Sequence, residues 1–304
     1  MAINKLTSVS VGIPAYNEES NIIFLINSIL NQKLSGIILN EIIIVCDGCT
    51  DKTVSLVKSL KNNKIKLIVN SERQGKVSSM NKMIKIANGD ILIVLDADIL
   101  PADNNFLVNI SLPIVADNNI GVVGAETVSV KPTTFFEKVI SDSHKFKTII
   151  YKKIDGGNNI FLCHGRGLAF NKDFYKKLHL INNHPTDAQS YLFCLSDGFK
   201  FKFQEKAKVL FSSPKTFNDH KRQHDRFVSG KKSFSGIFPY DFVSKAYYIP
   251  NKLLTYFLFN YFISDPISFI CYFTITFYLM IFKSTKDIYM TRWEMSKSTK
   301  KVIL

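Results

Sequence analysis

Two aspartates separated by a single residue, Asp96 and Asp98, are the strongest candidates for chemistry in this chain. They follow the uninterrupted apolar run Ile91–Leu95, which is typical of a strand buried on both faces of a mainly parallel sheet. Open α/β sheets bind ligands beyond the carboxyl ends of their strands, and an unpaired carboxylate is too costly to bury. The pair could therefore hold Mg²⁺ or Mn²⁺ together with substrate phosphates. The alternative interpretation is an Asx-rich turn that only caps the next element.

Two more polar segments, residues 14–20 and 46–51, also follow short apolar runs. Because parallel strands end at the same edge of a sheet, these segments and residues 96–101 should converge on one crevice. A divalent metal on a diphosphate bound there would neutralise the charge that develops as the diphosphate leaves. The residues thus indicate a nucleotide-diphosphate leaving group.

Three basic residues, Arg73, Lys76 and Arg226, could add charge-assisted hydrogen bonds to the same phosphate oxygens. Plainer interpretations stay open, since Lys76 could simply begin a helix and Arg226 could pair with a neighbouring aspartate on a solvated face. The sequence has no G-x-G-x-x-G after a strand and no G-x-x-x-x-G-K-[ST]. Their absence argues against dehydrogenases and P-loop NTPases.

Strands and helices alternate with short links through the first hundred residues, which predicts an α/β fold with right-handed crossovers and a parallel sheet. Asn17 is a plausible N-cap of the first helix, with Glu18 and Glu19 in its first turn. The predicted strands are 9–13, 42–45, 66–69, 91–95, 121–126 and 201–211; later helices are predicted from 73–76 to about 87, over 135–151, and over 188–195 with Thr186 and Asp187 as its cap.

Composition narrows the classes of protein. The 304 residues are 46% hydrophobic and 21% charged, which fits one sizeable domain with an appendage. Five irregularly spaced cysteines argue for a reducing compartment, and Cys46-x-x-Cys49 lacks the second pair that a zinc site needs, so a packed strand end is favoured. The first apolar run looks like a strand and not a signal segment, which predicts a cytosolic location. The formal charge of +14 calls for an anionic partner.

The composition changes near Lys252, and residues 253–282 are overwhelmingly apolar and aromatic except at Ser264-Asp265-Pro266. Neither half reaches the roughly 20 residues that a spanning helix needs. A single tilted helix would carry the basic tail outward, against the positive-inside tendency. We therefore predict a re-entrant hairpin or an interfacial helix pair. An ordinary buried hairpin or a dimer interface is the alternative.

Three segments together resemble inverting family 2 glycosyltransferases with a GT-A fold: Val11–Glu19, Val45–Thr53 and Asp96-Ala97-Asp98. Their order and spacing are highly specific, and the resemblance covers roughly residues 8–230. It implies a GT-A catalytic domain with a mainly parallel central sheet, followed by an apolar helical segment.

Two later segments extend the resemblance. Thr186-Asp187 resembles the family's Glu-Asp pair, and Gln223–Phe227 resembles the Q-x-x-R-W element of membrane-associated members. The resemblance therefore implies a catalytic domain over residues 1–230 and a membrane-associated helical region over residues 231–304.

The resemblance also implies contacts to the nucleoside of the donor. The loop with Pro14, Tyr16 and Glu18 would hold the nucleobase side together with Asp47, and Asp96 would face the ribose.

For the reacting end of the donor, the resemblance implies that Asp98 binds the divalent metal and that Gln223 and Arg226 serve the donor diphosphate and the acceptor site. Asp187 would deprotonate the acceptor hydroxyl as the general base. A plain helix N-cap is the alternative role for Asp187, and the two roles can coexist.

Three residues depart from the family pattern. Cys46 replaces the first aspartate of a pair, which leaves the identity of the donor base most in doubt. Thr186 replaces a glutamate beside the general base, and Phe227 keeps an aromatic wall in place of tryptophan.

These observations predict a membrane-associated glycosyltransferase whose catalytic domain lies on the cytoplasmic side of the cell membrane. It would use a nucleotide-diphosphate sugar, Mg²⁺ or Mn²⁺, and a lipid-linked or other glycan acceptor, and it would not bind nucleic acid. One rival is a processive polysaccharide synthase, although such enzymes carry several spanning helices. The other is a non-catalytic basic membrane adaptor or nucleic-acid binder, although the basic residues are spread along the chain. The oligomeric state is not predicted.

Overall fold

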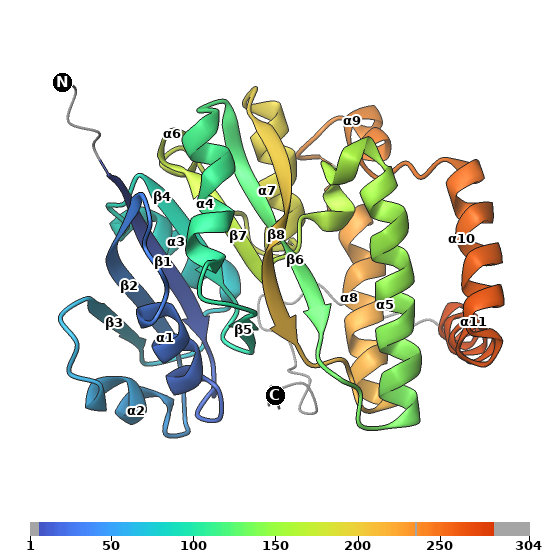
Figure 1. Cartoon of the computed structure of the whole chain (residues 1–304), viewed down its shortest axis with the longest axis horizontal. Coiled ribbons are helices and arrows are strands. Elements are labelled where there is room, and N and C mark those ends of the chain that lie inside the picture. The colour runs from blue at the N-terminus through green and yellow to red at the C-terminus, as the bar shows by residue number, and fades with distance from the viewer. Residues whose placement is uncertain (1–5, 235, 283–304) are drawn as a thin grey trace.

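The computed structural model describes residues 6–234 and 236–282. Its centre is an eight-stranded sheet in the order β3-β2-β1-β4-β7-β6-β8-β5, with helices on both faces (Figure 1). The strands are β1 (Thr7–Ala15), β2 (Ile37–Asp47), β3 (Ile65–Asn70), β4 (Ile91–Leu95), β5 (Ile99–Pro101), β6 (Ile120–Ser129), β7 (Gly167–Asn171) and β8 (Lys200–Phe211).

The helices connect these strands and then extend the chain beyond the sheet. They are α1 (Ile22–Leu30), α2 (Thr53–Ser59), α3 (Lys76–Ile86), α4 (Phe106–Ala116), α5 (Phe135–Lys153), α6 (Lys172–Tyr175), α7 (Thr186–Ser196), α8 (Phe217–Ser233), α9 (Tyr240–Ala246), α10 (Asn251–Ser264) and α11 (Pro266–Ile281). Two short 3₁₀ turns, Asp155–Gly157 and Ile160–Leu162, follow α5.

The predicted α/β fold is confirmed. Strands β3, β2, β1 and β4 pair in parallel, as the strand–helix alternation indicates. The remaining sheet is mixed, because β7 pairs antiparallel with both β4 and β6, whereas β6 and β8 are parallel. Strand β7 thereby places the loop that precedes it beside the carboxyl end of β4.

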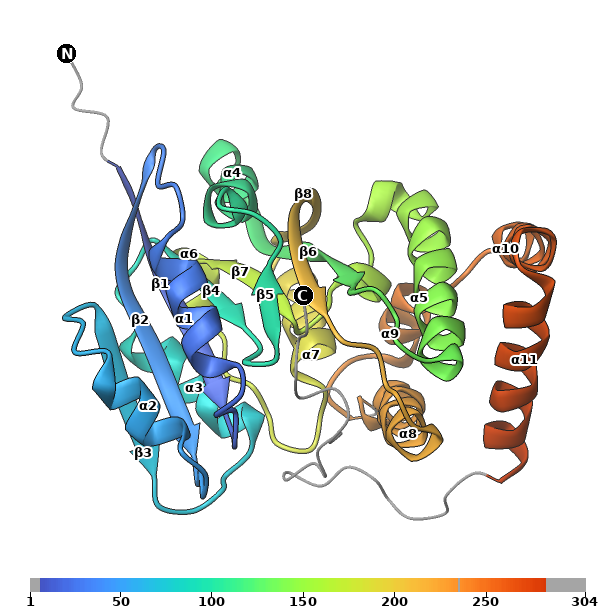
Figure 2. The ribbon, with the colours of Figure 1, turned by 60° about the horizontal axis from the view of Figure 1, so that its bottom comes forward.

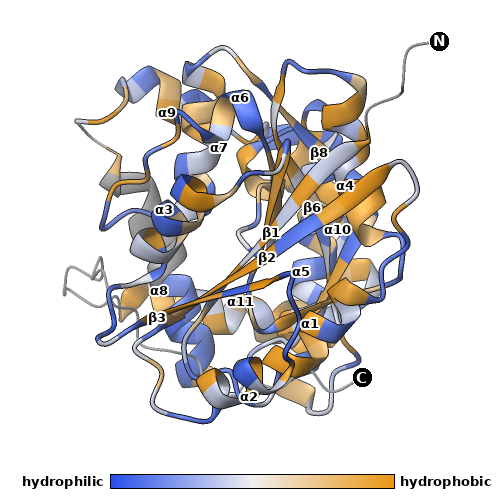
Figure 3. Cartoon of the chain, turned by 90° about the vertical axis from the view of Figure 1, so that its left-hand side faces the viewer, coloured by the Kyte–Doolittle hydropathy of each residue, from blue (hydrophilic) through white to orange (hydrophobic). Residues whose placement is uncertain are grey.

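Strand β4 is buried on both faces, as its continuous apolar run predicts. Ile91, Ile93 and Leu95 pack into the core beneath α1 and α4. The alternate residues Leu92 and Val94 pack into a second core with α3 and α7 on the opposite face. The sheet accordingly separates two apolar layers, and β1 and β2 are largely orange, and so hydrophobic, in Figure 3.

Two predicted helix caps are wrong. Asn21 and not Asn17 precedes α1, because Asn17 has a positive φ of 54° and its side chain accepts a hydrogen bond from the backbone N–H of Thr50 at 2.8 Å. Helix α7 begins at Thr186 with Pro185 in the N-cap position and no capping side chain, so Asp187 lies in the first turn.

The apolar C-terminal segment forms two helices, α10 and α11, that break at Asp265 and pack on α5 at the far end of the molecule from β3 (Figures 1 and 2). Lys138 on α5 ion-pairs with Asp265, and this contact joins the hairpin to α5. Lys138 also pairs with Asp142 of α5 itself at 2.7 Å. Within the described residues, no helix is long and apolar enough to cross a membrane. The predicted helix pair is thus present, and its placement in a membrane stays a prediction.

Candidate active site

The carboxyl ends of β1, β2 and β4 meet at one edge of the sheet, as predicted. Asp47 ends β2, and its carboxylate is fully engaged by the chain. Oδ1 accepts from Asn70 Nδ2 at 2.7 Å and from the Gln74 N–H at 2.8 Å, and Oδ2 accepts from the Gly75 N–H at 2.7 Å. The buried carboxylate therefore shapes the loop that leads into α3, so any contact with a donor base would be added to this structural role.

The loop after β1 is clamped to the loop after β2. The Glu18 N–H donates to Thr53 Oγ1 at 2.8 Å, and the buried Glu18 carboxylate accepts from Asn21 Nδ2 at 3.0 Å. Pro14 lies at the end of β1, and the Tyr16 ring stacks under the guanidinium of Arg73 at 4.0 Å. The structure thus brings the predicted nucleoside-side residues into one neighbourhood, with an aromatic–cation pair at its edge.

Glycine is required at position 48 of the second loop. Gly48 has φ of +69°, and a Cβ there would lie 2.5 Å from the backbone nitrogen of Arg73. The loop after β2 and the loop between β3 and α3 therefore approach each other backbone to backbone, which only a residue without a side chain permits.

Lys76, the first residue of α3, ion-pairs with Asp96 at the end of β4, and its Nζ donates to the carbonyl of Gly165 at 3.3 Å. The backbone N–H of Asp96 donates to the Arg166 carbonyl at 3.2 Å. Lys76 and Asp96 are both predicted to contact the donor, and in the structure they form an ion pair with each other. A diphosphate that binds Lys76 would share this ammonium with Asp96.

Asp98 lies two residues further on, next to Asp96 and facing the guanidinium of Arg166. Burial and the neighbouring carboxylate of Asp96 raise the pKa of Asp98, against the attraction of Arg166 and Lys76. Burial also lowers the pKa of Arg166, although Asp98, Asp96 and Asp187 favour its charged form. The guanidinium stacks on the Phe211 ring at 3.9 Å.

Asp187 approaches the same place from α7. An ideal Cβ on Gly165 would lie 3.2 Å from Lys76 Nζ and 3.7 Å from Asp187 Oδ2, so both groups border the space beside this glycine. The Asp187 Oδ1 accepts from the N–H of Ala188 at 2.9 Å. One oxygen is thus held by the first turn of α7, while the other faces the site.

The site fits a divalent cation that also binds substrate. Among the described residues, no side chain hydrogen-bonds the Asp98 carboxylate, and a bound cation would offset the burial and the Asp96 charge that raise its pKa. Within residues 6–234 and 236–282, no three histidine, cysteine or acidic side chains gather as a metal cage. A single carboxylate plus phosphate oxygens is how Mg²⁺ and Mn²⁺ are commonly held, so Asp98 is the residue that would bind the metal.

The two predicted residues of the Q-x-x-R-W-like element lie on α8, beside α5 in Figure 2. Gln223 is half-buried there. The side chain of Arg226 lies outside the described residues, so its predicted contact with the diphosphate stays a prediction.

The cysteine pair lines the nucleoside side of the site. Cys46 is buried in β2, and the Cys49 Sγ accepts from the N–H of Asn17 at 3.4 Å. The hydrogen bond between the two thiols lowers the pKa of Cys49 to about 7, and the same bond together with burial raises the pKa of Cys46. The structure places the pair at a packed strand end, which is the favoured sequence interpretation.

Sequence reasoning missed Arg166, which contacts the site from the loop before β7. The available signal was its position between Gly165 and Gly167, a tight backbone segment that often approaches a ligand.

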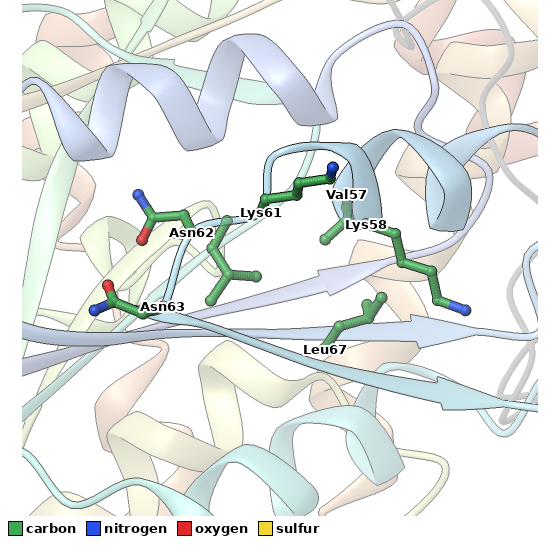
Figure 4. A pocket seen from close by; sticks show the side chains of 7 residues that line it. Val57, Lys58, Lys61, Asn62, Asn63 and Leu67 are labelled. Atoms are coloured by element: carbon green, nitrogen blue, oxygen red, sulfur yellow. The ribbon is translucent and has the colours of Figure 1, made fainter.

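A cavity of about 380 Å³ lies elsewhere, between α2 and β3 (Figure 4). Val57, Leu67 and two exposed lysines, Lys58 and Lys61, line it, and it contains none of the predicted site residues.

The sheet order, the carboxylates at its edge and the aspartate on α7 define a GT-A-like enzyme of the α/β class. Residues 10–178 match glycosyl transferase family 2, which is more than half of the chain. The chain therefore belongs to this family.

The sequence relatives align over about a third of this chain. An uncharacterized glycosyltransferase from Haemophilus influenzae is 33% identical over 92 residues, which is 30% of this chain and 36% of that protein. A poly-beta-1,6-N-acetyl-D-glucosamine synthase from Staphylococcus aureus is 32% identical over 97 residues, 32% of this chain and 23% of the synthase. The chain thus matches little more than a third of the length of these relatives at most.

Solved structures share the fold over most of the chain. A mannosyltransferase from Pyrobaculum calidifontis in complex with GDP-Man and Mn²⁺ has a TM-score of 0.56 and 19% identity, covering 92% of this chain and 76% of that one. A glucosyl-3-phosphoglycerate synthase from Mycobacterium tuberculosis with Mn²⁺, UDP and phosphoglyceric acid has a TM-score of 0.52 and 15% identity, covering 77% and 80%. The predicted family and GT-A fold are confirmed, whereas membrane association stays a prediction.

Proposed function

We propose that this enzyme is a metal-dependent, inverting hexosyltransferase that acts on a lipid-linked acceptor at the cytoplasmic face of the cell membrane. The observation that carries the proposal is the convergence of Asp98, Asp187, Lys76 and Arg166 at the carboxyl edge of the sheet. This edge supplies a metal-binding carboxylate, a base and two cations within one neighbourhood.

On the donor side, Lys76 and Arg166 would bind the diphosphate, and the hydrogen bonds of Asp47 and Glu18 hold the flanking loops in place before the donor arrives. Asp98 would hold the divalent metal, which supplies further neutralisation of the leaving diphosphate. The loops around the donor site are therefore already ordered in the folded protein, and donor binding does not have to order them.

On the acceptor side, the free oxygen of Asp187 would take the proton of the attacking hydroxyl. The acceptor oxygen forms a bond to the anomeric carbon as the bond from that carbon to the diphosphate breaks, and the electron pair leaves with the diphosphate. Attack from the face opposite the leaving group inverts the anomeric configuration.

The lipid-linked acceptor is supported by the surface of the α10–α11 hairpin. Its outer side chains leave large apolar groups uncovered, with Phe259 66% exposed and Ile263 62% exposed. Lys252 begins this hairpin in an exposed position, and Lys153 of α5 stacks on its Tyr256 at 3.7 Å. An apolar patch edged by lysines suits an anionic lipid surface, where each lysine contributes about 1 kcal/mol.

The donor reaction is tested by thermal unfolding of the purified protein with UDP, GDP or dTDP, each with Mn²⁺ or with EDTA. We expect one nucleotide to raise the melting temperature only with Mn²⁺, because a ligand of the native state stabilises by mass action. The shift should vanish in Asp98→Ala and persist in Asp103→Ala, an exposed aspartate outside the site. No shift with any nucleotide would contradict the proposed reaction.

Membrane association is tested by co-sedimentation with vesicles of phosphatidylcholine and phosphatidylglycerol. We expect the double variant Phe259→Ser/Ile263→Ser to lose most of the bound fraction. The matched control is Leu112→Ser/Val115→Ser, which removes two exposed apolar side chains from α4. Equal binding by both variants would contradict the hairpin as the membrane contact, and a change of oligomeric state would instead identify a dimer interface.

A further inference from the structure

A second group of basic side chains lies beside the proposed active site and is not used by the donor chemistry. His164 follows the buried Cys163 in the loop that carries Arg166, and its ring centroid lies 5.9 Å from that of His144 on α5. Arg166 lowers the pKa of both histidines, after the larger effect of burial. This second group of side chains therefore adjoins Arg166, whose guanidinium also interacts with the aspartates of the proposed active site.

Lys147, one turn further along α5, continues the group. It is half-buried, and its Nζ hydrogen-bonds the hydroxyl of Tyr272 on α11. Burial alone would lower the pKa of Lys147, but Tyr272 and Tyr151 outweigh burial and raise it. Within residues 6–234 and 236–282, no carboxylate pairs with this ammonium, which contacts the hydroxyl and the ring of Tyr272 instead.

His220 on α8 completes the group on the other side of Lys147. Its Nε2 is buried and has no hydrogen-bond partner among the described residues. Its ring packs edge-on against Phe136 of α5 at 6.2 Å. Burial and, to a smaller extent, Lys147 and His224 lower its pKa to about 4. A cation without a carboxylate partner, together with a ring nitrogen that makes no hydrogen bond among the described residues, is an arrangement that an anion with hydrogen-bonding oxygens would satisfy.

The position of this group agrees with that of an acceptor head. At one end it reaches Arg166, which faces Asp187, and at the other end Lys147 contacts the α10–α11 hairpin through Tyr272. Figures 1 and 2 show α5 and α8 between the sheet and that hairpin. A molecule held here would present one end to the base and the other to the apolar surface.

We propose that Lys147, together with His220, forms a binding site for a phosphate group of the acceptor. This inference rests on the proposed function, since it assumes that Asp187 activates an acceptor. The shared chemistry is a phosphate ester, which a lipid phosphate or a water-soluble sugar phosphate could both supply, and the alignment with the apolar hairpin favours the lipid.

The experiment keeps the donor site saturated with Mg²⁺ and the nucleoside diphosphate that stabilises the protein, and then titrates farnesyl phosphate, methyl phosphate and farnesol by calorimetry. We expect farnesyl phosphate to bind, and Lys147→Met to weaken its binding at least tenfold. Lys147→Arg should stay within threefold of the wild type because it keeps the charge. Lys145→Met, on the exposed face of α5, is the matched control for net charge and should also stay within threefold.

The outcomes separate the possibilities. Tighter binding of farnesyl phosphate than of methyl phosphate, with both dependent on Lys147, assigns the site to a lipid phosphate. Equal binding of the two phosphates assigns it to a water-soluble phosphate acceptor. Binding of farnesol as tight as that of farnesyl phosphate, or equal affinities in Lys147→Met and Lys145→Met, overturns the proposal.

Two further controls keep the result interpretable. Nucleoside diphosphate binding should be the same in Lys147→Met and in the wild type. If the wild type itself binds no nucleoside diphosphate, the proposed function fails. If nucleotide binding is intact and phosphate binding does not depend on Lys147, only this inference fails. If Lys147→Met does not fold, His220→Phe decides instead, because it keeps an aromatic ring against Phe136 and removes only the ring nitrogens. Unchanged phosphate affinity in that variant overturns the site.

Discussion

The donor edge of the sheet and the basic group on α5 and α8 treat charge in opposite ways. At the donor edge, Asp47 is bonded to loop amides and Asp96 to Lys76, so most charges are compensated by the chain itself. On α5 and α8, Lys147 and His220 have no anionic partner among the described residues. The donor side is therefore preorganised by contacts within the protein, whereas the basic side chains on α5 and α8 are the ones that a bound anion would pair with.

The largest effect is expected at the base that joins the two regions. Asp187→Asn removes the proton acceptor while keeping the shape of the side chain, so we expect sugar transfer to fall by about 10²- to 10⁴-fold. Nucleotide binding should stay within twofold, because Asp187 is not among the donor contacts. Initial rates under saturating donor measure the effect. Asp197→Asn, at the exposed end of the same helix, is the control; an equal loss there would point to α7 itself and not to the base.

The next effect separates structural from functional carboxylates. In Asp47→Asn, the new side-chain NH₂ group would face another donor, either the Gly75 N–H or the Asn70 amide. We therefore expect the free energy of unfolding, measured in urea, to fall by about 2–3 kcal/mol. The carboxylate of the exposed Asp103 accepts from the N–H of Asn105, and changing Asp103 to Asn should cost about 0.5 kcal/mol. Similar costs for both variants would show that the hydrogen bonds of Asp47 do not organise the loop.

Asp98 should behave in the opposite sense. Its pKa is raised in the folded protein, so its ionised form costs stability above that pKa, and Asp98→Asn should keep or increase the free energy of unfolding without metal, by up to about 1 kcal/mol. The same variant should lose the stabilisation by nucleotide with Mn²⁺. Urea unfolding with and without Mn²⁺ tests both halves, and a marked destabilisation without metal would make Asp98 a structural residue.

The basic group predicts a dependence on pH. The pKa of His220 is lowered from 6.5 to about 4 in the folded state, so the unfolded chain binds more protons between these values. Stability is therefore complete above about pH 6.5 and falls as the pH drops toward 4, by on the order of 1 kcal/mol at pH 5 from this residue. The unfolding free energy of His220→Phe should depend less steeply on pH in this window; an identical pH profile would exclude His220 as a cause.

The sequence predicts the donor region well for a local reason. Strand β4 and its two aspartates lie within eight residues, and the apolar runs of β1 and β2 end directly at their polar loops. The register of parallel strands then brings these ends together without further information.

The acceptor region could not be predicted in the same way. Arg166, Lys147 and His220 are separated by many residues, and they come into one region because the loop before β7, α5 and α8 lie near one another in the fold. The wrong cap at Asn17 has a similar origin, since a contact with Thr50 across two loops overrides the local preference for a cap. Contacts between residues that are far apart in the sequence depend on how the helices and loops pack, and the spacing of residues along one helix or strand does not predict them.

The smallest effect tests whether the space beside Gly165 belongs to the ligand. A Cβ there meets mainly the flexible end of Lys76 at 3.2 Å, so Gly165→Ala should change the free energy of unfolding by less than about 0.5 kcal/mol. Gly48→Ala provides the contrast, because a Cβ there would lie 2.5 Å from backbone at positive φ and should cost more than about 2 kcal/mol. If the space beside Gly165 receives the reacting groups, transfer by Gly165→Ala should nevertheless fall several-fold. Unchanged kinetics would place the reacting groups away from this glycine, and with them the proposed meeting point of donor and acceptor.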